Sequence, residues 1–500
     1  MVDGLSCLMA MKRNSQTMMR WRCSHLLGAD EMSSSLTSKH RKQTGRGSVD
    51  LVVRNAQLLM ESGLVRGGLG VKGGTICIIA TDEHLPEGDV TIDARERILM
   101  PGLIDGHAHI HDPAMLSHES FQSGSRAAAG GGVTTVIDMP LTSQVDSIKS
   151  VEEKIQQGKA HSVVDFSFYA GMINSGNVSI IPTFIEKGIA AFKAFTCAPY
   201  QAGTGVIAKA LSEVSEYGGH LTVHSEDQGV LDEFKKDMDG EWDAPISHSL
   251  ARPNLAEQLA VRQNISLAEQ TGGHLHIAHV TTREGLSEIE SAKLRGIMVT
   301  TEVCPHHLVF YRDDMNRLGP RSKMNPPLRT KEDRAALWSA LLRGMIDITV
   351  SDHAPCPIEK KEAGKDDIRE AWAGVDGTQM ILRVLLSEGI NKGRLSYTRL
   401  LRVAARNPAR IFGLYPKKGT LRIGSDADFV IIDPDREEKI TAEMMFSKCE
   451  WTLYEGMTMK GSPEMTFVRG TQVFGDGKIL TKPGRSEFQA MGSGGRPVGE

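Results

Sequence analysis

The chain is predicted to be an α/β protein: a (β/α)8 TIM-type barrel with a small β-sandwich domain formed by the N- and C-terminal segments. Three observations predict this class. Between residues 100 and 353, eight short apolar β-like runs occur, each followed by a stretch with helical patterning. Histidine, lysine and aspartate residues stand at the ends of several of these runs. Further β-like runs, broken by glycine and aspartate, occur at both ends of the chain.

The eight runs of the predicted barrel are, in order, MPGLIDGHAH, VTTVIDM, VVDFSFY, IAAFKAF, HLTVHSE, HLHIAHV, IMVTTEV and DITVSDH. Segments such as SVEEKIQQGKA and GVIAKALSEVSEYG follow them and have apolar residues at helical spacing. Regular alternation of strand and helix is typical of a parallel barrel with its helices outside.

The flanking segments set the predicted domain boundaries. Runs such as DLVVRNAQLLM come before the barrel, and runs such as GTLRIGSDADFVIIDPD come after it. We expect a disordered or targeting-like extension over 1–48, sandwich parts at 49–100 and 411–483, the barrel at 101–410 and a flexible Gly-rich tail at 484–500.

Composition excludes several classes of function. With 40 % hydrophobic residues, 24 % charged residues and a net charge of −4, the chain has no basic excess that would indicate nucleic acid or a membrane surface. No run of 18 apolar residues indicates a membrane span. Seven scattered cysteines without a CxxC pair fit a reducing compartment. We expect a cytoplasmic protein, with mitochondrial targeting by the basic first 47 residues as the alternative.

Six residues near the ends of the runs have the chemistry of metal ligands. Side chains alternate along a strand, so the apolar neighbours of Lys193, His279 and Asp352 predict that these three face the barrel interior. Unpaired charge is costly to bury, so a cluster of this kind predicts a metal site. The six candidates are His107, His109, Lys193, His224, His279 and Asp352.

Lys193 differs from the other five candidates, because a protonated amine is a poor metal ligand. Burial beside cations lowers the pKa of a lysine, and the neutral amine then reacts with carbon dioxide to give a carbamate. That anion has two oxygens, one for each of two metal ions. Lys193 is therefore a candidate bridging ligand.

The motifs PGLIDGHAH, FKAF, VHSE, HIAHV, SDHAP and GSDADFVIID resemble the amidohydrolase superfamily over residues 49–480. Within it they resemble the cyclic amidohydrolases. The resemblance implies a homotetramer and two divalent cations, usually Zn²⁺, with a hydroxide between them. It implies that one cation is held by His107, His109, carboxylated Lys193 and Asp352, and the other by carboxylated Lys193, His224 and His279.

The same resemblance implies the chemistry. The hydroxide would attack the amide carbonyl of a cyclic substrate. Asp352 would take the proton of the hydroxide and deliver it to the leaving nitrogen.

Three positions argue against a dihydroorotase, whose substrate carries a carboxylate that needs cationic or polar partners. KMNPPLR at 323–329 is similar to that family and implies that Asn325 contacts substrate. His111, however, stands at the arginine of dihydroorotases, Leu141 at the asparagine of their MPNT motif, and Cys356 at the histidine of their DHAPH motif.

Allantoinases match better at the residues that discriminate. Dihydropyrimidinases carry a tyrosine where this chain has Ala198, whereas MPL at 139–141, SDHAPCP at 351–357 and EAWAG at 370–374 resemble allantoinases. We therefore predict an allantoinase, which opens allantoin to allantoate, with dihydroorotase and dihydropyrimidinase (hydantoinase) as alternatives. The predicted substrate contacts are Asn325, His111, Leu141, Cys356 and Gly374.

A non-enzymatic alternative is a metal-free scaffold like the neuronal relatives of dihydropyrimidinase. All six ligand positions are present, which favours a hydrolase. Among the remaining histidines, His274 and His276 are predicted to lie outside the barrel, because they have the opposite parity to His279. His220 is expected to pack inside it, and His353 to orient the site.

Overall fold

The computed structural model describes residues 49–238 and 240–492 of the 500-residue chain. The predicted extension over 1–48 and the last eight residues of the predicted tail lie outside the described residues. None of the helices in the described ranges has the length and the apolar character that crossing a bilayer requires.

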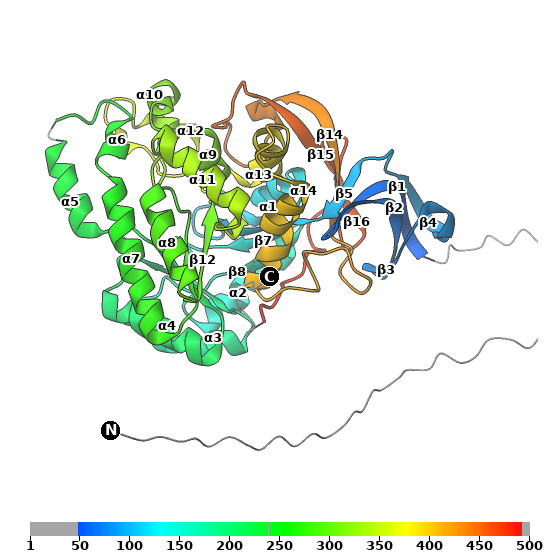
Figure 1. The fold of residues 1–500 in the computed structure, drawn as a ribbon, viewed down its shortest axis with the longest axis horizontal. Helices are drawn as coiled ribbons and strands as arrows, with labels where there is room; N and C mark the ends of the chain where they lie inside the picture. Colours follow the sequence, from blue (N-terminus) through cyan, green and yellow to red (C-terminus); the bar gives the residue numbers. More distant parts are fainter. Residues whose placement is uncertain (1–48, 239, 493–500) are drawn as a thin grey trace, which may run out of the picture. The chain divides into compact units, whose positions relative to one another are not determined.

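Eight parallel strands form the barrel, and each lies within one predicted run; Figure 1 labels β7, β8 and β12 of them. They are β6 Leu103–Ala108, β7 Val133–Asp138, β8 Asp165–Phe168, β9 Ala191–Phe195, β10 His220–His224, β11 Leu275–Ile277, β12 Val299–Val303 and β13 Ile348–Thr349. One parallel ladder runs from β6 through β7 to β8, and another runs from β9 through β10, β11 and β12 to β13. Parallel bridges from Ala170 to Phe192 and from Ala108 to His353 connect the two groups. The predicted barrel is confirmed, and its first and last strands meet.

The helices cover the outside of the strands, with α4, α7 and α8 standing next to one another in Figure 1. Caps explain where several begin: Ser147 accepts from the backbone of Ser150 at α2, and Thr330 and Asp333 form a reciprocal pair at α11. The α-helices are α1 Phe121–Gly130, α2 Ile148–His161, α3 Ile181–Glu186, α4 Thr204–Tyr217, α5 Gln228–Asp237, α6 Ser247–Leu250, α7 Asn254–Thr271, α8 Arg283–Leu294, α9 Pro305–Val309, α10 Asp314–Leu318, α11 Lys331–Arg343, α12 Ile358–Glu362, α13 Ile381–Val384, α14 Tyr397–Leu401 and α15 Asn407–Ile411.

The two terminal segments share one nine-stranded sheet, as predicted. Its order is β17-β16-β15-β14-β5-β1-β2-β3, with β4 also paired to β1. Antiparallel pairing of Leu99 with Ile431 joins the N-terminal part to the C-terminal part. The strands are β1 Val49–Met60, β2 Gly63–Lys72, β3 Thr75–Ala80, β4 Gly88–Asp93, β5 Ile98–Pro101, β14 Phe429–Lys439, β15 Thr458–Val468, β16 Thr471–Gly475 and β17 Lys478–Ile479.

The prediction of a flexible tail from residue 484 is wrong for residues 484–492. The backbone N–H of Phe166 in β8 donates to the carbonyl of Glu487 at 3.1 Å, and Gln489 donates back to Phe166 at 2.8 Å. The Phe488 ring lies 5.2 Å from that of Phe168. Apolar side chains within the Gly-rich stretch therefore anchor it to the barrel.

Candidate metal centre and active site

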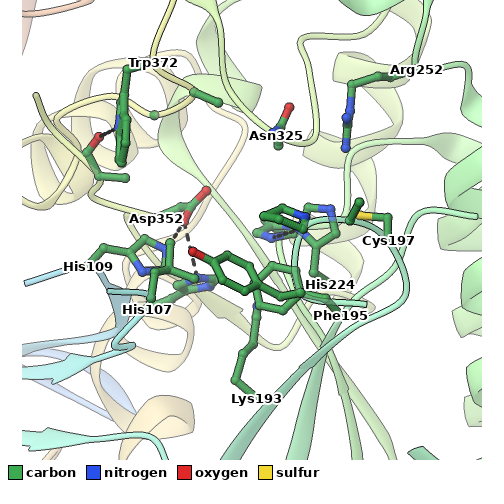
Figure 2. Close-up of a pocket in the computed structure, with 18 of the residues that line it drawn as sticks. His107, His109, Lys193, Phe195, Cys197, His224, Arg252, Asn325, Asp352 and Trp372 are labelled. Atoms are coloured by element: carbon green, nitrogen blue, oxygen red, sulfur yellow. Dashed lines mark hydrogen bonds and ion pairs between the residues drawn. The ribbon is translucent and has the colours of Figure 1, made fainter. Parts of the chain in front are cut away.

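All six predicted ligands line one cavity of about 490 Å³ at the carboxyl ends of the barrel strands. Figure 2 shows His107, His109 and Asp352 on one side of it and His224 on the other, with Lys193 between them. The strands bring together six residues that are far apart in the sequence; His107 and Asp352, the first and the last of them, are 245 positions apart. Barrel closure therefore assembles the predicted cluster.

The first group joins strands β6 and β13. Nε2 of His109 lies 3.0 Å from Oδ1 of Asp352, and Nε2 of His107 lies 3.3 Å from the same oxygen. One ligand atom from each of these three residues lies within 4.8 Å of the other two. Two imidazoles and a carboxylate at this spacing suit a divalent cation such as Zn²⁺.

Hydrogen bonds behind the first two histidines fix their tautomers. Nδ1 of His107 is 2.5 Å from Oε1 of Glu302, and Nδ1 of His109 is 2.6 Å from the carbonyl oxygen of Met139. Both oxygens accept, so Nδ1 of each histidine carries the proton and Nε2 turns its lone pair toward Asp352. This is the arrangement that a metal-binding histidine requires.

The second group comes from β10 and from the residues that follow β11. Nδ1 of His224 lies 3.1 Å from Nε2 of His279, and Nε2 of His224 lies 2.8 Å from Oε2 of Glu226. Nδ1 of His279 is buried without a hydrogen-bond partner among the described residues. Glu226 accepts from Nε2 of His224, so Nδ1 of His224 turns its lone pair toward Nε2 of His279, and these two converging imidazole nitrogens would suit a second cation.

The residues around His279 correct the alternation argument. Strand β11 ends at Ile277, and His279 lies beyond it with φ of +30°, so strand parity does not apply to it. Leu275 and Ile277 pack outward against the helices. His276 faces inward, where its Nε2 lies 3.0 Å from Glu302.

The prediction for His274 and His276 was therefore wrong, and that for His220 is confirmed. Rings of His274 and His276 lie 5.5 and 5.8 Å from that of His220, which contacts Phe412 at 5.2 Å inside the barrel. His353 hydrogen-bonds Glu119 at 2.9 Å beside Asp352, a position suited to the orienting role predicted for it.

Lys193 completes the set. Its ammonium nitrogen is buried, has no hydrogen-bond partner among the described residues and lies 4.9 Å from the centre of the Phe195 ring. Burial lowers the pKa of Lys193 to about 8. A fraction of the amine is therefore neutral at physiological pH and able to form a carbamate. These residues fit two divalent cations bridged by a carboxylated lysine.

Of the five predicted substrate contacts, Leu141, Asn325 and Gly374 line the cavity. His111 and Cys356 are not among its lining residues, and direct substrate contact by these two stays a prediction. Nδ1 of His111 lies 3.2 Å from Oγ1 of Thr142, and the His111 ring meets that of Trp372 edge-on at 5.9 Å. Cys356 is buried, and its carbonyl oxygen accepts from the Trp451 indole at 2.9 Å.

Several residues of the site had not been predicted. Glu302 and Glu226 orient ligand histidines, and Arg252 lines the cavity while pairing with Glu226. The signal for Glu302 lay in the predicted seventh run, IMVTTEV, where it was the one charged residue. Trp372 stands across the cavity from Lys193 in Figure 2, with its indole donating to the Ala354 carbonyl at 3.2 Å.

The fold and the site define a barrel hydrolase with a candidate two-metal centre, and comparison with known proteins agrees. The model of the Amidohydrolase family matches residues 98–473. The chain therefore belongs to the amidohydrolase family, in its group of cyclic amidohydrolases.

Relatives that carry three different enzyme names are about equally similar to this chain. The chain is 33 % identical to the L-hydantoinase of Paenarthrobacter aurescens over 88 % of its length and 97 % of that protein. It is 34 % identical to the allantoinase of Rubrobacter xylanophilus, over 87 % and 96 %. It is also 34 % identical to the dihydroorotase of Methanosarcina acetivorans, over 89 % and 96 %.

A solved structure, the L-hydantoinase (dihydropyrimidinase) from Arthrobacter aurescens, superposes with a TM-score of 0.85 at 33 % identity. The match covers 88 % of this chain and 99 % of that one. The barrel and β-sandwich architecture is thus that of the hydantoinases. Overall similarity does not distinguish one ring substrate from another.

Proposed function

We propose that this protein is a metal-dependent allantoinase that hydrolyses the ring of allantoin to give allantoate. The six converging ligand side chains support ring hydrolysis. The observation that carries the choice of substrate is the position of His111, which lies behind the cavity wall with its Nδ1 on Thr142. A dihydroorotase would need a cation there for the carboxylate of its substrate.

Asp352 is the proposed catalytic acid–base. Burial alone would raise the pKa of this carboxyl, but the adjacent imidazoles of His107 and His109 hold it well below its usual range. Asp352 is therefore ionised at neutral pH, which is the state from which a carboxylate can accept a proton. It would return that proton to the ring nitrogen as the carbon–nitrogen bond breaks.

The remaining roles follow from the donor set. His107, His109 and Asp352 would hold one cation, His224 and His279 the other, and the carbamate of Lys193 would bridge them. The bound cations would supply Lewis acidity, activating water and polarising the ring carbonyl. Leu141, Phe195 and Trp372, which line the cavity, would enclose the ring and limit access of bulk water.

A turnover panel with allantoin, dihydroorotate, dihydrouracil and hydantoin tests the substrate. We expect the highest kcat/KM with allantoin, and fastest turnover of dihydroorotate would refute our interpretation of His111. Metal analysis separates the enzyme from the scaffold alternative, with about two ions per chain expected for the enzyme. A homotetramer in the cytoplasm remains a prediction that rests on family resemblance and composition, and light scattering would test the assembly.

A further inference from the structure

A second cavity of about 440 Å³ adjoins the metal cavity. The two share Arg252, Asn325 and Ala373, and Asn325 and Arg252 lie next to each other above the metal ligands in Figure 2. We call the second one the arm cavity. Lys235 and Arg369 are among the residues that line it, and none of its lining residues in the part of the chain that the structure describes is an aspartate or a glutamate.

His248 determines which end of the Asn325 side chain faces the cavities. Nε2 of His248 lies 3.0 Å from the carbonyl oxygen of Met324 and 3.0 Å from Oδ1 of Asn325. A backbone carbonyl only accepts, so Nε2 carries the proton. The Asn325 atom at the same nitrogen must then be its oxygen, which leaves the NH₂ group of the amide to face substrate.

Lys323 adds a second donor at this junction. It is almost buried, and its ammonium nitrogen donates to the carbonyl of Arg369 at 2.6 Å. Within the described residues no carboxylate comes within ion-pair distance of it. Acidic side chains act on it only from farther away, from Asp367 and Glu370. A buried ammonium with one neutral acceptor still has protons to donate.

Arg252 is the third donor. Its guanidinium is held by Glu226, with Nε 3.1 Å from Oε1, and it forms part of the wall of both cavities. The passage from the metal cavity to the arm cavity is therefore lined by N–H donors. An alkyl group in it would leave the remaining N–H groups of these side chains without acceptors, at a cost in binding free energy.

We propose that the arm cavity binds the substituent of the ring substrate through an acceptor oxygen, a carbonyl or a carboxylate. His248 is then a positioning residue that acts through the Asn325 amide. The proposal rests on the proposed function, because it places the ring itself in the metal cavity. The ureido carbonyl of allantoin has the required chemistry, and so does a carboxylate.

Three hydantoins with 5-substituents of similar length provide the test: ureido (allantoin), carboxymethyl and propyl. We expect kcat/KM for both oxygen-bearing compounds to exceed that of the propyl compound roughly tenfold, mainly through KM. His248→Ala should remove most of this preference and leave the propyl compound within about twofold. His248→Gln should restore it, because a glutamine amide can donate to the same two oxygens. An equal loss for all three compounds in His248→Ala would overturn the proposal.

Two further variants test the route and the source of the oxygen. In an Asn325→Ala background, adding His248→Ala should lower kcat/KM for the oxygen-bearing compounds by less than about twofold. If the losses of the two variants add, the histidine does not act through the amide. If a carboxylate is preferred, Lys323→Met should weaken binding of the carboxymethyl compound selectively. If a carbonyl suffices, it should weaken binding of both oxygen-bearing compounds alike. An unchanged preference in Lys323→Met would contradict the donor role of Lys323.

Calorimetric affinities of the same three compounds separate this proposal from the proposed function. If the metal-loaded protein opens none of the rings, the hydrolase assignment fails, yet tighter binding of the oxygen-bearing compounds would still support the arm cavity. Equal affinity for all three would overturn it.

Discussion

Glu302 contacts His107 and His279 of the candidate metal centre and the neighbouring His276, so Glu302→Gln should weaken metal binding. Its carboxylate lies 2.5 Å from Nδ1 of His107, 3.0 Å from Nε2 of His276 and 3.1 Å from the backbone N–H of His279. The nearby histidines, His107 foremost, hold the pKa of Glu302 well below its usual range although burial opposes this. Glutamine keeps the shape but removes the charge and one acceptor.

The contacts set the size of the effect. The glutamine oxygen can still accept from His107 and His279, while its NH₂ group must face His276, which can change tautomer because its Nδ1 lies 2.8 Å from the Thr300 hydroxyl. The main loss is the charge assistance to His107, which roughly halves the strength of that hydrogen bond. We expect apparent metal affinity to fall about 10- to 100-fold, or about 1.4–2.7 kcal/mol.

Chelator competition followed by metal analysis measures this affinity directly. Asp333→Asn is the matched control, because Asp333 is a buried carboxylate that caps α11 away from the ligands. It should lower Tm and leave metal affinity within about twofold. Wild-type affinity in Glu302→Gln, or an equal loss in the control, would refute the orienting role.

Three more predictions concern the bridge, a buried acid and a helix contact. Lys193→Ala should abolish turnover, and small carboxylic acids should partly restore it in a rate assay; full activity without them would exclude the bridging role. Burial raises the pKa of Asp376 to about 6, so the folded protein holds this proton more tightly than the unfolded chain does, and stability is lost as pH rises through 6. At pH 8, Asp376→Asn should therefore have a higher Tm than wild type, with a gain of up to about 3 kcal/mol in the free energy of unfolding. This gain should vanish toward pH 4, and a gain that stays constant with pH would contradict the prediction. Gly158→Ala in α2 would place a methyl group 2.3 Å from the Phe166 ring and should cost about 1–3 kcal/mol in denaturant unfolding. Gly205→Ala in α4, with open space around it, should instead be neutral or stabilising by up to about 1 kcal/mol, and equal losses would rule out the packing explanation.

Local patterns predicted the barrel because each strand run carries its own signal. Lys193 shows this clearly: it lies inside β9, where alternation with Ala191 is a property of the extended backbone and places it in the interior. At His279, alternation pointed to a residue that does line the cavity, but His279 lies beyond the end of β11, where alternation does not apply. The strand there is only three residues long, and where the chain leaves it depends on packing that alternation does not describe.

The residues that support the ligands were harder to predict. Glu302 and His276 face each other across neighbouring strands, and only the barrel register shows that a buried carboxylate has a histidine on either side. His111 and Cys356 were assigned to substrate by their place beside a motif. A difference of one or two residues along a loop decides whether a side chain lines the cavity or packs behind it.

The sequence by itself determined the fold class and the class of chemistry, and it picked out six residues that meet in one cavity, because strand periodicity and residue type are local properties of the chain. Tertiary structure alone decided which side chains line the cavity, which tautomers the histidines adopt and which atom of Asn325 accepts from His248. Those features depend on contacts between residues far apart in sequence, such as His107 with Glu302 and His248 with Asn325. Closure of the barrel brings such pairs together, and no local pattern records their geometry.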